Sequence, residues 1–233
     1  MSQSGKYPAK AQHIVIAAYG TLGDVYPFLQ LGLALQQRGH RITIATSDIY
    51  RETLEKIGLT FFPMRPNLDG LGQTLDEFGK KLMDPTKGSE FIYREVLIPN
   101  LRDSYADLAK AAEGADLLVT HPLVLAASLL SEKTGIRWIS TVLAPLSFSS
   151  KYDPSVFTVN PFPDPQKLPA FVVGWIISAI KKSIWHWMQP IQEFRAELGL
   201  PPGKDPLFEG QHSPHRVMAL FSKEFAKPQR DWP

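Results

Sequence analysis

Apolar positions in this chain fall into short continuous runs that alternate with longer segments of helical spacing. The first run, Ile14 to Ala18, is apolar throughout, which is typical of a central strand in a parallel sheet covered on both faces. Gly20 and Gly23 interrupt the pattern, and apolar residues then recur at helical spacing between Pro27, expected in the first helical turn, and Gly39. The segment therefore predicts a strand, a glycine turn and a helix, the first βα unit of an α/β domain.

The same alternation continues along the chain. Long connections rich in Gly, Pro, Asn and Asp are expected at Met64 to Gly88, with one short helix at 75–82, and at Leu143 to Leu168, where prolines recur. Further strands are expected at 41–46, 59–63, 116–120, 136–142 and 216–221, and further helices at 48–57, 90–113 with a break at Pro99, 123–133, 171–188 and 191–198. This order predicts a doubly wound parallel sheet with helices on both faces and all carboxyl ends of the strands at one edge.

Two polar residues are predicted to meet at that edge. Asp24 follows the first strand and its glycine turn, and His121 directly follows the strand that ends at Thr120. A carboxylate beside an imidazole can orient it, and either group can take a proton from a substrate hydroxyl. The purely structural interpretations stay open: Asp24 as a helix-capping carboxylate, and His121 as a polar residue at a strand end. The turn itself lacks the third glycine of a dinucleotide fingerprint and the Gly-Lys-Ser/Thr of a P-loop.

Composition narrows the possible functions. The 233 residues are 44% hydrophobic, enough for a large buried core, and 25 basic against 23 acidic side chains give no nucleic-acid footprint. No cysteine is present, so disulfides and thiolate metal sites are excluded, and the six histidines show no metal-binding spacing. The polar residues 1–12 lack the apolar core of a signal peptide, which predicts a disordered lead-in and a cytoplasmic protein.

One segment raises the question of a membrane. Residues 171–180 read FVVGWIISAI and are followed by Lys181 and Lys182. A membrane-spanning helix needs about 20 residues, so this run is too short to cross a bilayer. We expect a helix packed on its own domain or lining an apolar cleft. Its aromatic and lysine content keeps peripheral contact with a membrane surface as the alternative.

Four stretches in order resemble the GT-B glycosyltransferases with a family 28 N-terminal half, which modify sterols, lipids and antibiotic aglycones. They are residues 20–46 (GTLGDVYPFLQLGLALQQRGHRITIAT), 119–141 (VTHPLVLAASLLSEKTGIRWIST), 194–202 (FRAELGLPP) and 218–233 (MALFSKEFAKPQRDWP). The resemblance implies a Rossmann-like domain over residues 13–233, the acceptor-binding N-terminal half of a GT-B fold. The donor-binding C-terminal domain, its partner in such enzymes, is absent from this chain, so the isolated chain is expected to be inactive.

The resemblance also implies roles for single residues. Asp24 matches the position of the base that activates the acceptor, and His121 matches its partner; plant relatives exchange the two residue types, which leaves open which one is the base. The turn is expected to approach the donor diphosphate. Acceptor contacts are expected on other grounds, from side chains at the sheet edge and in the Pro-rich loop. The residues concerned are Gly20, Thr21 and Gly23 for the donor, and Tyr19, Leu22, Tyr26 and Phe148 for the acceptor.

The implied reaction is an inverting, metal-independent transfer of a hexose to a hydroxyl of a hydrophobic small-molecule acceptor. It uses no cofactor, only a nucleotide-sugar co-substrate of the UDP-hexose type. Two alternatives remain. The lipid-linked N-acetylglucosaminyltransferase of peptidoglycan synthesis usually carries Gly-Gly-His where Leu22-Gly23-Asp24 stands here. A non-catalytic module that binds a hydrophobic ligand would use the same edge and the Pro-rich loop.

Overall fold

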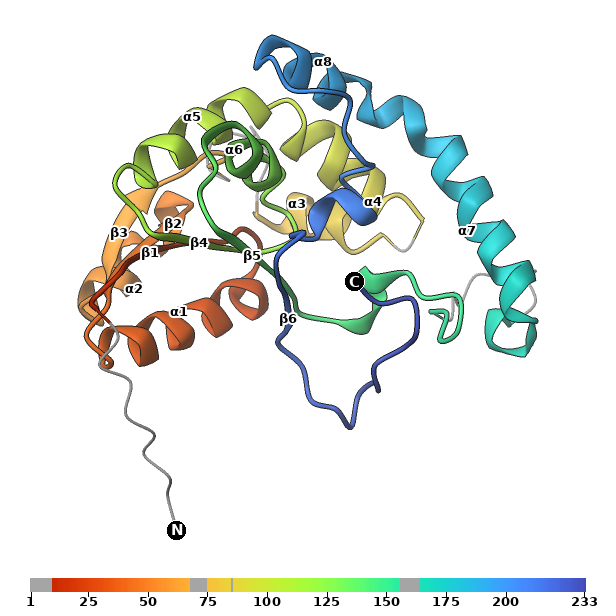
Figure 1. The fold of residues 1–233 in the computed structure, drawn as a ribbon, viewed down its shortest axis with the longest axis horizontal. Helices are drawn as coiled ribbons and strands as arrows, with labels where there is room; N and C mark the ends of the chain where they lie inside the picture. The colour runs from red at the N-terminus through yellow and green to blue at the C-terminus, as the bar shows by residue number, and fades with distance from the viewer. Residues whose placement is uncertain (1–9, 68–74, 85, 156–163) are drawn as a thin grey trace.

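The computed structural model describes residues 10–67, 75–84, 86–155 and 164–233, and its centre is a six-stranded sheet (Figure 1). The strand order is β3-β2-β1-β4-β5-β6, and every pairing is parallel. The strands are β1 (His13–Ala17), β2 (Arg41–Thr46), β3 (Thr60–Pro63), β4 (Leu117–Thr120), β5 (Trp138–Val142) and β6 (Val217–Ala219). The predicted doubly wound α/β fold is confirmed. The predicted lead-in lies outside the described residues, apart from 10–12.

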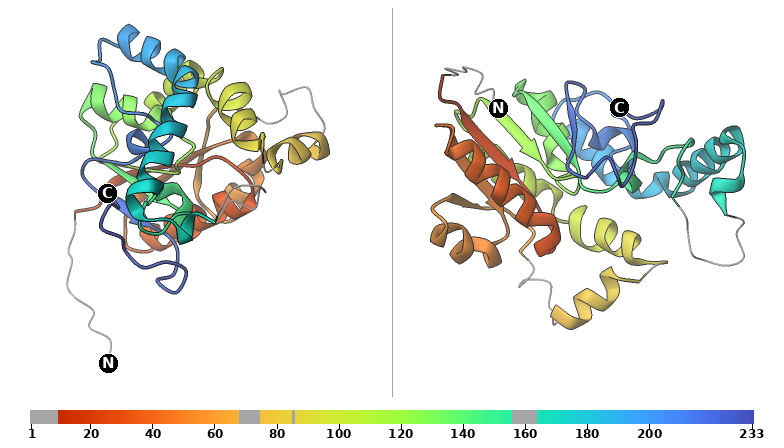
Figure 2. Two further views of the ribbon diagram at one scale, coloured as in Figure 1. Left: turned by 90° about the vertical axis from the view of Figure 1, so that its right-hand side faces the viewer. Right: turned by 90° about the horizontal axis from the view of Figure 1, so that it is seen from below.

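The sheet buries one hydrophobic core on each face. Side chains alternate along a strand, so Val15 and Ala17 of β1 enter one core, while Ile14 and Ile16 enter the other. The helices are α1 (Leu22–Gln36), α2 (Arg51–Lys56), α3 (Leu75–Leu82), α4 (Gly88–Phe91), α5 (Leu101–Ala111), α6 (Ala126–Thr134), α7 (Ala170–Ile184) and α8 (Gln189–Glu197). Helices α1 and α2 cover one face, and α5 and α6 cover the other (Figures 1 and 2).

The functional edge is set by the pairing of β1 with β4. The strand order reverses at β1, because β2 follows it on one side and β4 joins it on the other. Ala17 lies opposite Thr120, and the backbone N–H of His121 donates to the Ala17 carbonyl oxygen at 2.9 Å. Ligand crevices in open α/β sheets lie outside the carboxyl ends of strands at such a reversal. The sheet thus brings the turn after β1 beside His121.

Helix α1 begins earlier than predicted. It starts at Leu22, so Pro27 lies within the helix instead of in its first turn. Proline has no N–H, so the Gly23 carbonyl loses its usual intrahelical donor. The early start has a functional consequence, because it places Asp24 at the third helical position with its side chain in the capping zone.

Other boundaries differ by smaller amounts. The helix expected at 90–113 is divided into α4, a π-helical turn (η3, Ile92–Leu97) and α5, which begins after the predicted break at Pro99. The helix expected after β2 opens as a 3₁₀ turn (η1, Asp48–Tyr50), and the one expected at 171–188 ends as another (η6, Trp185–Met188). Shorter 3₁₀ turns are η4 (Pro145–Phe148), η5 (Pro165–Lys167) and η7 (Glu209–Gln211).

Candidate functional site

Asp24 is held by the glycine turn that precedes it. Its Oδ2 accepts hydrogen bonds from the backbone N–H of Thr21 at 2.7 Å and from the Thr21 hydroxyl at 2.9 Å. Gly20 has a φ of +123°, and a Cβ built on it would lie 2.3 Å from that same Oδ2. The turn therefore requires glycine at position 20 both for its backbone conformation and for room. The positive end of the α1 dipole further favours the ionised carboxylate.

The second carboxylate oxygen of Asp24 faces His121. Oδ1 lies 3.7 Å from the Nε2 of His121, whose side chain is almost fully buried. The His121 ring also makes an edge contact with Phe28, with centroids 5.8 Å apart and an interplanar angle of 76°. Asp24 and Phe28 are four residues apart, so they share one face of α1. This face of α1 thus presents the Asp24 carboxylate to His121 and packs Phe28 against the His121 ring.

The hydrogen bonds of His121 assign its tautomer. Its Nδ1 accepts from the backbone N–H of Leu123 at 3.2 Å, so the neutral ring carries its proton on Nε2, toward Asp24. Partial burial favours a higher pKa for Asp24, but the contact with His121 and the hydrogen bonds from Thr21 outweigh it and hold this pKa below its ordinary value. Asp24 is thus ionised at neutral pH and able to accept a proton.

Tyr50 supports the turn, and sequence reasoning missed it. Its buried hydroxyl donates to the Gly20 carbonyl oxygen at 2.9 Å. Burial raises the pKa of Tyr50, with the nearby Asp24 and Tyr26 adding to the effect. The sequence offered one signal: an aromatic residue soon after β2, which pairs with β1, stands at the same edge as the glycine turn.

The other predicted residues of the turn surround Asp24 and face solvent. Leu22 is 55% exposed and Tyr26 is 46% exposed. Thr21 and Gly23 are exposed as well. The structure therefore brings an ionised carboxylate, a buried imidazole and two accessible apolar side chains to one edge of the sheet.

Tyr19 lies elsewhere. It is buried in the core on the opposite face from Phe28, and its hydroxyl donates to the Arg65 carbonyl oxygen and lies 3.2 Å from Ser104 Oγ. Burial raises the pKa of Tyr19 well above its ordinary value. Tyr19 directly precedes the glycine turn in the sequence, but its side chain is oriented away from that turn.

Phe148 is also separate from the turn. Its ring stacks on Trp232 with centroids 4.3 Å apart and lines a cavity of about 930 Å³. The inner face of α7 forms another wall, through Gly174 and Ile177. No residue from 19 to 26 is among the described residues that line this cavity. Phe148 and Asp24 therefore belong to different parts of the surface.

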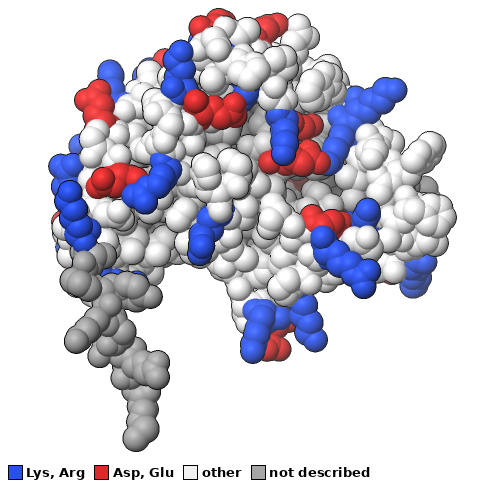
Figure 3. Space-filling view, viewed as in Figure 1, with Lys and Arg blue, Asp and Glu red and all other residues white. Residues whose placement is uncertain are grey.

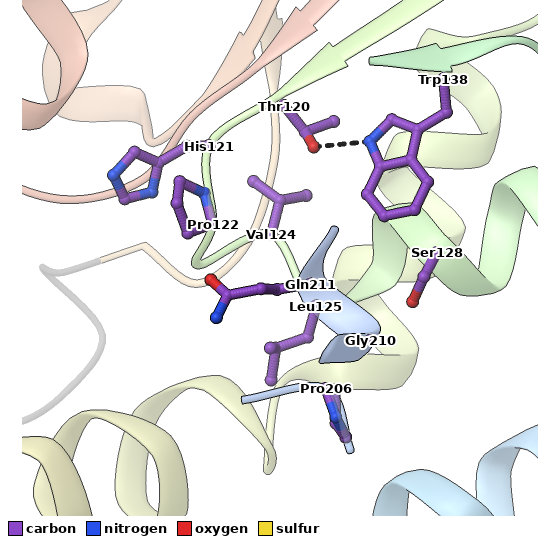
Figure 4. A pocket seen from close by; sticks show the side chains of 10 residues that line it. All are labelled: Thr120, His121, Pro122, Val124, Leu125, Ser128, Trp138, Pro206, Gly210 and Gln211. Carbon is purple, nitrogen blue, oxygen red and sulfur yellow. Dashed lines mark hydrogen bonds between the residues drawn. The ribbon is translucent and has the colours of Figure 1, made fainter. Parts of the chain in front are cut away.

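A small pocket of about 10 Å³ lies between His121 and this cavity (Figure 4). Trp138 borders it and donates from Nε1 to Thr120 Oγ1 at 2.8 Å. Ser128, Trp138 and Gly210 line both spaces. The small pocket is too narrow for a substrate, and it lies beside the large cavity with these three residues as a common wall.

Metal-binding clusters and membrane-spanning helices are both lacking among the described residues. No three His, Cys, Asp or Glu side chains within 10–67, 75–84, 86–155 and 164–233 converge in a way that could hold a metal ion. Across the same ranges, none of the helices combines the length and the apolar character that crossing a membrane requires.

Comparison with known proteins supplies further findings. Residues 14–140 match the family described as glycosyltransferase family 28 N-terminal domain. The chain is similar to the O-mycaminosyltylonolide 6-deoxyallosyltransferase of Streptomyces fradiae, at 27% identity over 228 residues, covering 94% of this chain and 52% of the relative. It is also similar to the sterol 3-beta-glucosyltransferase of Debaryomyces hansenii, at 27% identity over 160 residues, covering 69% of this chain and 10% of the relative.

Among solved structures, the glycosyltransferase of kitacinnamycin resembles this chain with a TM-score of 0.59 and 16% identity, over 91% of this chain and 46% of the other. At that identity the likeness concerns the fold. The chain spans about half the length of the first bacterial relatives that it matches.

Proposed function

The chain belongs to the glycosyltransferase family 28 N-terminal domain family, and on this premise we propose that residues 13–233 form the acceptor-binding domain of an inverting hexosyltransferase. The proposed enzyme moves a hexose from a nucleotide sugar, UDP-hexose in the first instance, to a hydroxyl of a hydrophobic acceptor such as a sterol, lipid or other aglycone. The observation that carries the proposal is the ionised Asp24 at the sheet edge, whose Oδ1 lies 3.7 Å from the Nε2 of His121.

In the proposed mechanism Asp24 is the base. Its carboxylate accepts the proton of the acceptor hydroxyl while that oxygen forms a bond to the anomeric carbon. The bond from the anomeric carbon to the donor oxygen breaks at the same time, and the nucleotide diphosphate leaves with that electron pair. His121 is the positioning residue. Its Nδ1 accepts a hydrogen bond from the backbone N–H of Leu123, and its Nε2–H faces the carboxylate. A ring in this tautomer turns its N–H toward Asp24 across 3.7 Å and has no free nitrogen lone pair on that side, which supports Asp24 over His121 as the base.

Substrate contacts follow from exposure around the turn. Leu22 and Tyr26 are the accessible apolar side chains next to Asp24, and we assign the acceptor side to them. The orientations of Tyr19 and Phe148 do not support a direct contact with an acceptor held at Asp24. Gly20, Thr21 and Gly23 are assigned to the donor diphosphate, which a donor-binding domain of the same enzyme would supply. We further propose a cytoplasmic location with peripheral membrane contact.

The test is Asp24→Asn in a two-domain protein that contains this chain. The amide keeps the size of the carboxylate but accepts no proton, so kcat should fall by about 10²–10⁴-fold. Asp153→Asn, an exposed site outside the turn, is the matched control and should leave kcat unchanged. Transfer at the wild-type rate by Asp24→Asn would remove Asp24 from the base role.

His121→Gln separates the two roles. It should lower kcat less than Asp24→Asn and move the acidic limb of the pH profile upward, because Asp24 loses the neighbour that lowers its pKa. A loss as complete as that of Asp24→Asn, with no shift of the remaining profile, would instead assign the base to His121.

A further inference from the structure

Helix α7 carries large apolar side chains on its outer surface. Phe171 is 78% exposed, Trp175 is 79% exposed, and Trp185 in the adjoining η6 turn is 50% exposed. Ile176 and Ile180, on other sides of α7, are each 40% exposed. The helix lies at the right-hand edge of the molecule in Figure 1 and faces the viewer in the left view of Figure 2. Single exposed apolar residues are ordinary, but several on one helix mark an interaction surface.

The opposite face of α7 is the one that packs on the protein. Val173 is buried, and Gly174 and Ile177 line the large cavity. Phe171, Trp175 and Lys182 occur at spacings of four and seven residues, which places them on one stripe of the helix. This stripe, the outer face, is apolar over its first turns and ends in a lysine.

Basic side chains lie at both ends of the outer face, and one of them, Lys167, lies 3.9 Å from Asp164. Between Pro165 and Gln192 the chain has three lysines, at 167, 181 and 182, and no acidic residue. Lys167 and Lys182 are exposed near the two ends of α7, and Lys181 pairs with Glu209. In the space-filling view the right-hand flank is largely white, with both blue and red side chains at its border (Figure 3). Aromatic side chains with lysines at the rim suit a surface that is apolar inside and anionic outside.

Two serine hydroxyls of α7 are hydrogen-bonded within the helix. The Ser178 hydroxyl donates to the Gly174 carbonyl oxygen at 2.8 Å, and the Ser183 hydroxyl donates to that of Ile180 at 2.8 Å. Hydroxyls bonded within the helix cost less to remove from water than hydroxyls that depend on solvent. These two hydroxyls can therefore leave water without losing their hydrogen bonds.

We propose that the outer face of α7 docks on an anionic lipid bilayer, with the helix axis in the plane of the headgroups. Phe171 and Trp175 enter the boundary between headgroups and acyl chains, and Lys167 and Lys182 contact the anionic headgroups. The lysines favour lipid over a second copy of this chain, because two such faces would bring like charges together. The proposal does not depend on the reaction at Asp24.

The test is sedimentation of the 233-residue chain with vesicles of phosphatidylcholine alone or mixed with phosphatidylglycerol. The wild-type chain should bind the mixed vesicles, and added salt should weaken the binding. The double variant Phe171→Ser/Trp175→Ser should lower the partition coefficient by about tenfold or more, because it removes the inserted side chains. Lys182→Glu should weaken binding to mixed vesicles and leave the weak binding to neutral ones unchanged.

Phe225→Ser is the matched control, since Phe225 is 83% exposed on the C-terminal segment and not on α7. It should bind as the wild type does. Equal binding by the wild type and the α7 double variant overturns the proposal. So does concentration-dependent dimerisation that the double variant abolishes, because a second copy would then be the occupant. The assay contains neither acceptor nor donor, so its failure leaves the proposed transfer untouched.

Discussion

Replacing Gly20 with alanine tests the structure of the glycine turn that precedes Asp24. Gly20 has a φ of +123°, a backbone conformation that residues with a side chain rarely adopt. An alanine held in this conformation is strained by about 1–3 kcal/mol. A new Cβ would also meet three atoms of one side chain: Asp24 Oδ2 at 2.3 Å, Cγ at 2.6 Å and Cβ at 2.7 Å. Rotating the carboxylate away relieves the first two contacts but not the third, so the backbone must shift.

The magnitude follows from these two effects. Overpacking of this kind costs about 1–3 kcal/mol, so Gly20→Ala should lower the free energy of unfolding by about 2–6 kcal/mol in total. In a domain of this size each kcal/mol lowers Tm by about 2–4 °C. Gly39→Ala is the matched control, because Gly39 has a φ of +87° but nothing within 4 Å of its Cβ position. It should cost only the conformational strain, about 1–2 kcal/mol.

A double-mutant cycle in urea, followed by circular dichroism, isolates the contact with Asp24. Asp24→Gly removes all three obstructing atoms, so Gly20→Ala should cost about 1–3 kcal/mol less in that background than in the wild type. The same cost in both backgrounds would refute the close approach of Gly20 and Asp24. A cost equal to that of Gly39→Ala in the wild-type background would refute it as well.

Two further predictions concern stability. Tyr50→Phe removes the donor to the Gly20 carbonyl and should lower the free energy of unfolding by about 1 kcal/mol, measured by urea denaturation; an unchanged midpoint would show that the turn does not need this hydrogen bond. Burial and the nearby Arg41 lower the pKa of His13, so the folded state binds this proton less readily than the unfolded state. Stability should therefore be complete above pH 6.5 and decline as pH falls below it, and His13→Gln should flatten that decline in thermal melts; an equally steep decline in the variant would assign it to other groups.

Much of the architecture could be predicted because it depends on local patterns. The apolar run of β1, the break at Pro99 and the helix α3 at Leu75–Leu82 follow from residues close in sequence. Even the meeting of Asp24 and His121 was predictable, since parallel strands bring their carboxyl ends to one edge. The predicted start of α1 was wrong, because the hydrogen bond from Thr21 to Asp24 caps the helix and lets it begin at Leu22, well before Pro27.

Within the site, the sequence by itself determined which chemical groups stand at the edge of the sheet: a carboxylate after β1 and an imidazole after β4. Only the tertiary structure decided how they act. The tautomer of His121, the support from Tyr50, the burial of Tyr19 against Ser104 and the stacking of Phe148 on Trp232 depend on orientation or on partners distant along the chain. The exposure of Phe171 and Trp175 is decided in the same way, because a periodic pattern shows that a helix has an apolar face, but only the packed fold shows whether the protein covers it.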